Sequence, residues 1–316
     1  MRETMSYRIG FDIGGTKCAV SLGEVKEGSI CLLERQETPT LDDPKKTLST
    51  LAPFVKEWVK EYGVTLAGIS CGGPLSSEKG LIISTPNLAK GWHGFYIVDY
   101  VKKEFGLSAR LQNDANACAV AEWKFGAGQG TKNMIFFTFG TGLGAGLILD
   151  GKLYAGTNDN AGEAGHIRIA KSGPVGYGKA GSFEGFCSGG GIARLAAQMA
   201  ARCKNTPECI KKMGGMSAIT TKKLAMAAFD GDKFAKRVFA KSGEMLGKGL
   251  SVIIDLFNPE KIVIGGVFMR SAALLTPAMY KVLKKETLGE SLQVCEIVPA
   301  KLSENIGDIA ALSLAE

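Results

Sequence analysis

Apolar and polar positions alternate at strand spacing near the start of the chain and then change to helical spacing. Residues 7–13 form an apolar, β-favouring run, and residues 18–22 and 30–34 alternate well enough to be two further strands. Between residues 51 and 62 the apolar positions recur every three or four residues, which predicts an amphipathic helix with Pro53 in its first turn or at a kink. The opening of the chain is therefore expected to be a meander followed by a helix.

Strand and helix patterns then alternate. We expect a buried strand over residues 64–70, a helix over 97–105, a strand over 108–112 and a helix over 116–125. Alternation of this kind is typical of a sheet covered by helices. The sequence thus predicts an α/β fold for this part of the chain.

The order of elements at the start of the chain recurs after residue 132. An apolar strand over residues 133–139 leads into a second glycine loop, Gly140–Gly144, and strands are expected over 145–149 and 152–154. This restates the opening order of strand, glycine loop, strand, turn and strand. The repetition favours two similar α/β domains.

The remaining part of the chain is mainly helical in pattern. Helices are expected over residues 191–203, over 217–229 with Ser217 as the N-cap, and over 232–257. A short β-branched strand over 261–264 ends in Gly265-Gly266, a turn suited to close approach by a planar ligand.

Composition indicates an ordinary globular protein. At 316 residues the chain favours two domains, and its formal net charge of +7 comes from 38 basic and 31 acidic residues that are scattered as a solvated surface rather than gathered as a nucleic-acid stripe. The eight cysteines include no CxxC pair, which favours reduced thiols and a cytoplasmic location. No leader-like apolar region and no run of about 20 apolar residues is seen, so neither export nor membrane insertion is expected.

The first glycine loop follows the first strand and has the form of an anion-binding nest. Gly14 and Gly15 let backbone N–H groups face a concavity, and Thr16 can add a hydroxyl donor. The carboxylate of Asp12 would repel phosphate unless a cation lies between them, as when Mg²⁺ accompanies ATP. A tight hairpin turn with an incidental acid is the alternative, and the loop is not a Walker A motif.

Two groups of polar residues could carry chemistry. Asp114 lies where a strand gives way to a helix and could act as a general base, although an aspartate there is more often a helix N-cap. Glu163, His166 and Glu184 could hold adjacent hydroxyls of a sugar, with metal binding or a structural histidine as alternatives. Asn87 is ordinarily part of a turn.

Together these motifs resemble those of the ROK family, which comprises repressors, open reading frames and sugar kinases. The resemblance runs in order from Tyr7 to the end of the chain and is carried by Phe11–Lys17, Gly72-Gly73-Pro74, Thr85–Leu88 with Gly91-Trp92, Gln112–Asn116, Phe139–Gly144 and Gly162–His166. It implies the actin-like ATPase (ribonuclease H-like) fold, with two similar α/β domains around a cleft. On this basis we expect an N-terminal domain over residues 1–115, a larger domain over 116–304, and a C-terminal helix over 305–316 that packs back on the first domain.

The resemblance also implies roles for individual residues. Asp114 would be the base that deprotonates the sugar 6-hydroxyl. The other hydroxyls would be held by Gly73, Asn87, Asn113, Glu163, His166 and Glu184. The nucleotide would be bound by Gly14, Gly15, Thr16, Lys17, Thr141 and Gly142 at its phosphates, by Asp12 near Mg²⁺, and by Gly265 and Gly266 at adenosine.

One segment departs from the family pattern. Where the family usually shows CGCGxxGCxE, residues 175–184 read VGYGKAGSFE, so the glycines and the final glutamate remain but all three cysteine positions are replaced. Structural zinc is therefore not expected. His166, which the metal orients in typical members, must here be oriented by hydrogen bonding or by packing around Tyr177.

The implied activity is transfer of the ATP γ-phosphate to the 6-hydroxyl of a hexose, by a cytoplasmic enzyme that is a homodimer by family resemblance. Glucose is the first candidate, N-acetylmannosamine, N-acetylglucosamine, fructose and allose stay open, and polyphosphate is a possible donor. The rival function is that of a non-catalytic sugar sensor. The lack of a helix-turn-helix ahead of Tyr7 disfavours a direct repressor, and the lack of a peptide-binding or filament-forming segment disfavours an Hsp70- or actin-like ATPase.

Overall fold

The computed structural model describes residues 6–26, 28–302 and 306–316. They form two compact units. The first unit contains the described residues within Met1–Lys132, Gly146–Ala161 and Lys301–Glu316, and the second contains Asn133–Ala145 and Gly162–Ala300. The domain boundaries expected at residues 115/116 and 304/305 stay predictions, and the second of them lies outside the described residues.

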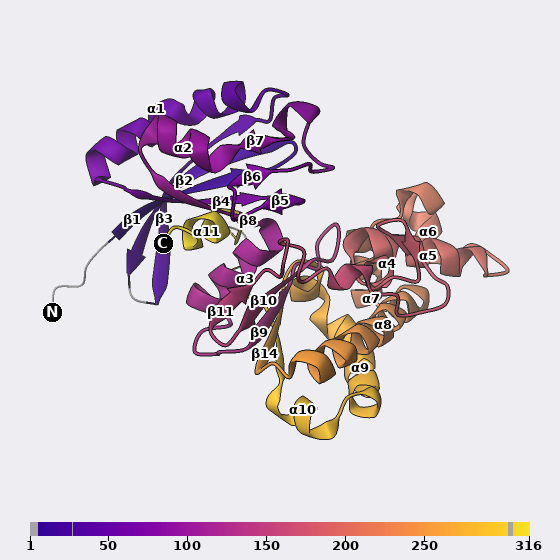
Figure 1. The fold of residues 1–316 in the computed structure, drawn as a ribbon. Helices are drawn as coiled ribbons and strands as arrows, with labels where there is room; N and C mark the ends of the chain where they lie inside the picture. The colour runs from indigo at the N-terminus through magenta and orange to yellow at the C-terminus, as the bar shows by residue number, and fades with distance from the viewer. Residues whose placement is uncertain (1–5, 27, 303–305) are drawn as a thin grey trace. The chain divides into compact units, whose positions relative to one another are not determined.

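The first unit is built on a mixed five-stranded sheet with the order β3-β2-β1-β4-β8 (Figure 1). The predicted meander is present, since β1 (Ser6–Ile13), β2 (Lys17–Lys26) and β3 (Ser29–Pro39) pair antiparallel. On the other side of β1, β4 (Leu66–Cys71) and β8 (Ser108–Asn113) continue the sheet in parallel. The first glycine loop and the carboxyl ends of β4 and β8 thus lie at one edge of the sheet, where α/β folds commonly bind ligands.

Helices α1 (Pro44–Tyr62) and α2 (Ile97–Phe105) cover one face of this sheet and close the main core (Figure 1). The helix predicted from residue 51 begins seven residues earlier, because Asp43 caps it by accepting from the N–H groups of Lys45 and Lys46. Pro53 is therefore inside α1, so of the two predicted alternatives the first turn was wrong. The polar first turns of α1 hid the true start from a search for apolar periodicity.

Helix α11 (Ile306–Ser313) lies against the opposite face of the sheet, on glycines. A Cβ atom on Gly68 would lie 1.9 Å from the carbonyl oxygen of Ala311, and one on Gly10 would lie 2.9 Å from the amide nitrogen of Leu312. Only residues without a side chain permit so close an approach. Helix α3 (Asp114–Phe125) follows β8 and also contacts α11.

The first unit also contains smaller elements beside the sheet. They are the three-stranded sheet of β5 (Leu75–Ser76), β6 (Leu81–Ile82) and β7 (Phe95–Tyr96), and residues 146–161, which contain β11 (Lys152–Tyr154) and, except for Ala145, its antiparallel partner β10 (Ala145–Leu149). The small sheet adjoins the segment that carries Asn87.

The second unit combines parallel strands with a helical layer. Strand β14 (Lys261–Ile264) pairs in parallel with β9 (Met134–Phe137) and with β15 (Glu296–Pro299). The other elements are β12 (Val175–Gly176), β13 (Lys179–Ala180), α4 (Phe183–Phe186), α5 (Gly189–Ala201), α6 (Glu208–Met213), α7 (Thr221–Phe229), α8 (Lys233–Phe257), α9 (Val267–Glu286) and α10 (Gly289–Val294). Thr220 caps α7, so the prediction of Ser217 was wrong: Ser217 lies in a separate 3₁₀ turn.

The predicted repetition of elements is present along the chain. Strand β9, the loop 140–144, β10 and β11 follow one another as β1, the loop 14–16, β2 and β3 do. In each case the first strand also pairs in parallel with a later strand, β1 with β4 and β9 with β14. The chain is thus an α/β protein with two related halves.

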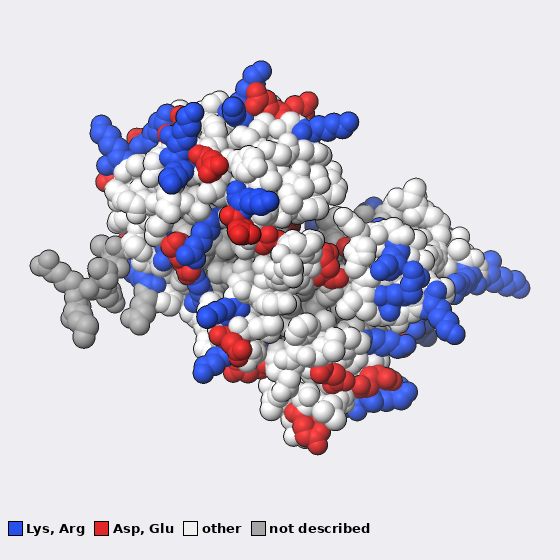
Figure 2. Space-filling model, viewed as in Figure 1, with Lys and Arg blue, Asp and Glu red and all other residues white. Residues whose placement is uncertain are grey.

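Charged side chains are spread over the visible face, with acidic and basic groups interspersed (Figure 2). Among the described residues, no helix combines the length and the apolar character that crossing a membrane would require.

Candidate functional site

The first glycine loop is fixed by contacts that require glycine. The N–H of Gly14 donates to the carbonyl oxygen of Lys17 at 3.1 Å, and the hydroxyl of Thr40 donates to the carbonyl oxygen of Gly14 at 2.6 Å. A Cβ atom on Gly15 would lie 2.1 Å from the carbonyl oxygen of Asn87. The loop and the Asn87 segment can therefore meet only because residue 15 has no side chain.

A small pocket of about 120 Å³ lies beside this loop, within the first unit. Five of the predicted site residues line it, namely Asp12, Gly14, Gly15, Asn87 and Asp114. Cys71, Gly72 and Thr85 also line it, although no role had been predicted for them. The structure thus brings residues of β1, β4 and α3 and of the Asn87 segment to one place.

Four predicted residues of the first unit are not in the lining of this pocket: Gly73, Asn113, Thr16 and Lys17. Gly73 directly follows Gly72, and Asn113 directly precedes Asp114, and both of these neighbours line the pocket. Lys17 instead pairs with Glu37, with 2.9 Å between the lysine Nζ and the carboxylate Oε2. The roles predicted for these four residues stay predictions.

Asn113, not Asp114, caps helix α3. The side-chain oxygen of Asn113 accepts from the N–H of Asn116 at 2.7 Å. Asp114 is the first residue of the helix, and its Oδ1 accepts from the N–H of Ala115 at 2.8 Å. The alternative in which Asp114 is only the N-cap was therefore wrong, and its carboxylate is left facing the pocket.

The two carboxylates of this pocket are shifted toward their neutral forms. Burial, then repulsion from Asp308 and Asp114, raises the pKa of Asp12 to about 6, although Arg35 and Lys17 act in the opposite direction. Asp114 is open to the pocket, yet the surrounding protein reduces its hydration and raises its pKa, while the hydrogen bond from Ala115 partly offsets this. A cation between them would relieve the repulsion.

The second glycine loop lies in the second unit and is held by Glu184. The N–H of Leu143 donates to Glu184 Oε2 at 3.1 Å, and the N–H of Gly140 donates to the carbonyl oxygen of Gly142 at 2.9 Å. A Cβ atom on Gly142 would lie 2.7 Å from the same carboxylate oxygen. Glu184, predicted as a sugar contact, thus also fixes the loop, while Thr141 is exposed at its tip.

The turn that carries Glu163 and His166 packs beside this loop. A Cβ atom on Gly165 would lie 2.2 Å from the carbonyl oxygen of Leu143. The His166 ring meets the Tyr177 ring edge-on, with 4.7 Å between centroids and 72° between planes, and Lys179 Nζ donates to the carbonyl oxygen of His166 at 2.7 Å. Packing around Tyr177, one of the two alternatives expected, is therefore present.

No group of three or more His, Cys, Asp or Glu side chains that could hold a metal ion occurs among residues 6–26, 28–302 and 306–316. The expected lack of structural zinc stays a prediction.

The N-termini of two long helices meet at the base of the second glycine loop. The N–H of Gly189, at the start of α5, donates to the carbonyl oxygen of Gly140 at 2.7 Å. The N–H of Val267, at the start of α9, donates to the carbonyl oxygen of Phe139 at 2.8 Å. Gly266 has a φ of 60°, and Gly265 and Gly266 lead from β14 into α9 at this point. Helix N-termini favour anions, which makes this a suitable place for phosphate groups.

The helix predicted from residue 191 begins at Gly189, and no role in the site had been predicted for its N-terminus. The run Ser188-Gly189-Gly190-Gly191 follows Glu184 closely, and a capping serine before glycines is a recognisable helix start that permits close approach.

Comparison with known proteins identifies the family of this chain. The model of the ROK family matches residues 8–316. The chain belongs to the ROK family. Its fold is the actin-like ATPase fold of ROK sugar kinases, as the resemblance implied.

Three relatives illustrate the range of the ROK family around this chain. It is 31% identical over 315 residues to a glucokinase of Streptomyces coelicolor, covering 98% of each chain. A ROK glucokinase of Streptomyces griseus in complex with glucose and AMPPNP has a TM-score of 0.75 and 30% identity, with 98% of this chain and 99% of that chain covered. A ROK transcriptional regulator, a homologue of the Escherichia coli MLC protein, has a TM-score of 0.84 and 26% identity, with 99% and 78% covered.

Proposed function

We propose that this chain is an ATP-dependent kinase that transfers the γ-phosphate to the 6-hydroxyl of a hexose, with glucose as the first candidate. The observation that carries the proposal is the pocket in which the carboxylate of Asp114 faces Asp12 and the first glycine loop. The glucokinases among its relatives support the choice of reaction and of sugar.

Asp114 is the proposed general base. Since Asn113 takes the capping role, the Asp114 carboxylate, which keeps its hydrogen bond from the N–H of Ala115, can accept a proton from a hydroxyl in the pocket. Its raised pKa makes the ionised carboxylate a stronger base than that of an ordinary aspartate. Phosphoryl transfer needs little more from the protein than positioning and charge stabilisation.

The proposed phosphate contacts come from both glycine loops. Gly14, Gly15, Thr16 and Lys17 would act in the first unit, and Thr141 and Gly142 in the second, next to the N-termini of α5 and α9. Gly265 and Gly266 would lie against adenosine.

Asp12 is the residue that would hold Mg²⁺ accompanying ATP. Its carboxylate is the kind of ligand that Mg²⁺ prefers, and its repulsion from Asp114 and Asp308 is what a cation would relieve. When bound, Mg²⁺ neutralises part of the negative charge of the phosphates.

The sugar would be held by Gly73, Asn87, Asn113, Glu163, His166 and Glu184. In two of these residues, one side-chain atom already accepts a hydrogen bond within the protein. The side-chain oxygen of Asn113 caps α3, so its amide NH₂ is the group left for a sugar hydroxyl. Glu184 Oε2 holds Leu143, so Oε1 is the oxygen available to the sugar.

The cytoplasmic location and the homodimer likewise stay proposals.

A coupled assay of ADP formation across hexoses and hexosamines tests this function. We expect one sugar, glucose first, to stimulate ADP release, and Asp114→Asn to lower kcat by about 10²- to 10⁴-fold because the base is lost. Asp42→Asn, which removes an exposed carboxylate outside the pocket, is the matched control and should turn over normally.

Two outcomes would contradict the mechanism proposed here. Equal turnover by Asp114→Asn and the parent would remove Asp114 from the mechanism. Sugar binding without any ADP release would favour a non-catalytic sensor, the alternative suggested by the likeness to a ROK transcriptional regulator.

A further inference from the structure

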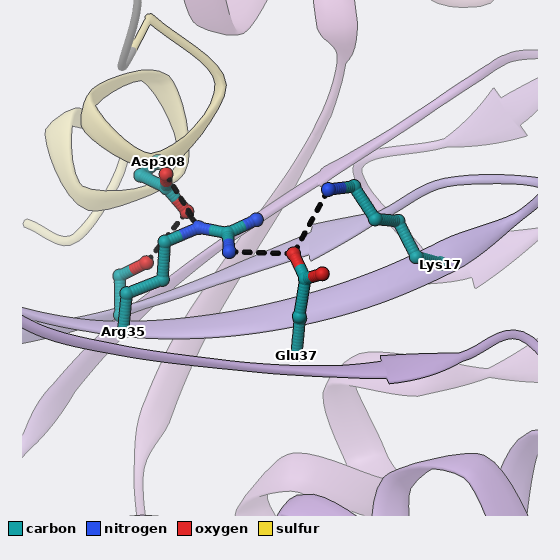
Figure 3. Close-up of polar contacts among 5 residues, drawn as sticks. Lys17, Arg35, Glu37 and Asp308 are labelled. Atoms are coloured by element: carbon teal, nitrogen blue, oxygen red, sulfur yellow. Dashed lines mark hydrogen bonds and ion pairs between the residues drawn. The ribbon is translucent and has the colours of Figure 1, made fainter.

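Four charged side chains form a continuous chain on the sheet face that α11 covers, and none of them except Lys17 has a role in the function proposed above. Figure 3 shows Asp308 next to Arg35, Arg35 next to Glu37, and Glu37 next to Lys17. The register of β2 and β3 explains the arrangement, because Ser21 lies opposite Arg35 and Ala19 lies opposite Glu37. The chain of charges thus runs from α11 to the end of the first glycine loop.

Asp308 is the buried end of this chain, with a side chain only 10% exposed. Both of its oxygens accept from Arg35 Nε, at 2.9 and 3.1 Å, and Oδ1 also accepts from the hydroxyl of Ser21 at 2.7 Å. A carboxylate in such a place is costly unless a cation compensates it. Arg35 supplies that compensation.

The charge of Asp308 also acts on Asp12. Its neighbour Gly307 lies so close to Asp12 that a Cβ atom there would be 3.0 Å from the Asp12 carboxylate, and Asp308 repels that carboxylate. Arg35 therefore does more than attach α11 to the sheet, since it cancels a negative charge beside the residue expected to face the phosphate donor.

Glu37 shares one oxygen between two cations. Its Oε2 accepts from Arg35 Nη1 at 2.6 Å and from Lys17 Nζ at 2.9 Å, and the side chains of Lys17 and Glu37 are 58% and 44% exposed. If Lys17 leaves for a phosphate oxygen, Glu37 keeps its bond to Arg35 and no carboxylate is left unpaired. An exposed ion pair contributes little by itself, so this exchange should cost little.

We propose that Arg35 is a positioning residue for the phosphate donor: it neutralises Asp308 beside Asp12 and holds Glu37 so that Lys17 stays at the first glycine loop, ready to exchange Glu37 for a phosphate. This inference rests on the proposed function, since it assigns a further residue to the donor side of that reaction. In this role Arg35 and Asp308 affect the binding of the nucleotide and not the binding of the sugar.

The test measures nucleotide and sugar separately in Arg35→Met, Asp308→Asn and the double variant. Isothermal titration gives the Kd for MgATP, the coupled assay gives KM for ATP and for the sugar, and thermal unfolding gives Tm. We expect Arg35→Met to weaken MgATP binding and raise the KM for ATP about tenfold, the usual effect of losing a charge-assisted contact, with the sugar KM within about twofold of the parent.

The double variant distinguishes positioning from simple attachment of α11. With Asp308 neutral, the negative charge beside Asp12 is gone and only the contact of Arg35 with Glu37 stays lost, so Arg35→Met/Asp308→Asn should recover most of the MgATP affinity lost in Arg35→Met. It also covers the case in which Arg35→Met does not fold, because it leaves no unpaired buried carboxylate. Lys56→Met, which breaks an exposed ion pair with Glu104, is the control and should change neither the Kd for MgATP nor the KM for the sugar.

Three results would overturn the inference. The first is unchanged MgATP binding in Arg35→Met. The second is an equal loss of affinity for sugar and nucleotide that parallels a fall in Tm. The third is a double variant that binds MgATP no better than Arg35→Met. A parent protein that binds no MgATP, or binds it without sugar-dependent turnover, would instead mark a failure of the proposed function.

Discussion

Asp12 and Asp114 are two carboxylates in the wall of one small pocket, and their proximity costs stability. An ordinary core would not place two like charges together, because burial and mutual repulsion both disfavour the ionised forms. Sites that bind charged ligands retain such arrangements because the ligand, rather than the fold, supplies the compensation.

Replacing Asp12 by Asn should therefore stabilise the free protein, in a pH-dependent way. The pKa of Asp12 is raised to about 6 in the folded protein, above its value in the unfolded chain. The ionised Asp12 carboxylate therefore lowers the free energy of unfolding fully above that pH, and this destabilisation disappears as the carboxyl group becomes protonated. We expect Asp12→Asn to be more stable than the parent by on the order of 1–3 kcal/mol near about pH 8, and the difference to vanish toward about pH 4.

Urea unfolding of the two proteins across this pH range measures the effect. The control is Asp42→Asn, at an exposed position outside the pocket, which should be close to neutral in stability. If Asp12→Asn is less stable than the parent at the higher pH, or if the difference does not change with pH, the account of this pocket is wrong.

Several contacts between individual side chains could not be predicted from the sequence. Asn113 and Asp114 are both good caps, and only the backbone geometry shows that Asn113 takes the role. The bond from Leu143 to Glu184 joins residues far apart in the chain, so no local pattern could reveal it. Arg35 and Asp308 were missed for the same reason, since each is an ordinary surface-type residue until α11 lies on the sheet.

Helix α11 is the element that sequence patterns describe least well. Its position depends on glycines in β1 and β4, and a glycine within a strand pattern indicates close approach without saying of what. Many of the other strands and helices, by contrast, followed from local periodicity, and the bounds of α2, β11 and β14 were predicted to the residue.

Gly68→Ala should loosen this helix. The added Cβ atom would lie 1.9 Å from the carbonyl oxygen of Ala311, so the backbone of α11 has to move. We expect a loss of about 1–3 kcal/mol in the free energy of unfolding, as for other overpacked sites, measured by denaturant titration. Gly289→Ala, where an added Cβ meets no atom within 4 Å, is the control and should be close to neutral. A Gly68→Ala protein as stable as that control would contradict the close packing described for α11.

At the scale of the whole molecule, the repeated order of strand, glycine loop and strand was visible in the sequence and is present in the structure. The motifs that resembled the ROK family identified the fold correctly, because they occur in the right order along almost the entire chain. The family includes sugar kinases and a transcriptional regulator with the same fold, so membership alone does not fix the activity.

The fate of the ATP γ-phosphate tests the central claim most directly. Phosphorus NMR of a mixture of the protein, MgATP and glucose should show the γ-phosphate signal replaced by a phosphomonoester coupled to the two protons on carbon 6 of the sugar, together with an equal amount of ADP. ADP with inorganic phosphate alone would indicate an ATPase rather than a kinase, and an unchanged spectrum with glucose and with every other hexose and hexosamine of the panel would contradict the account.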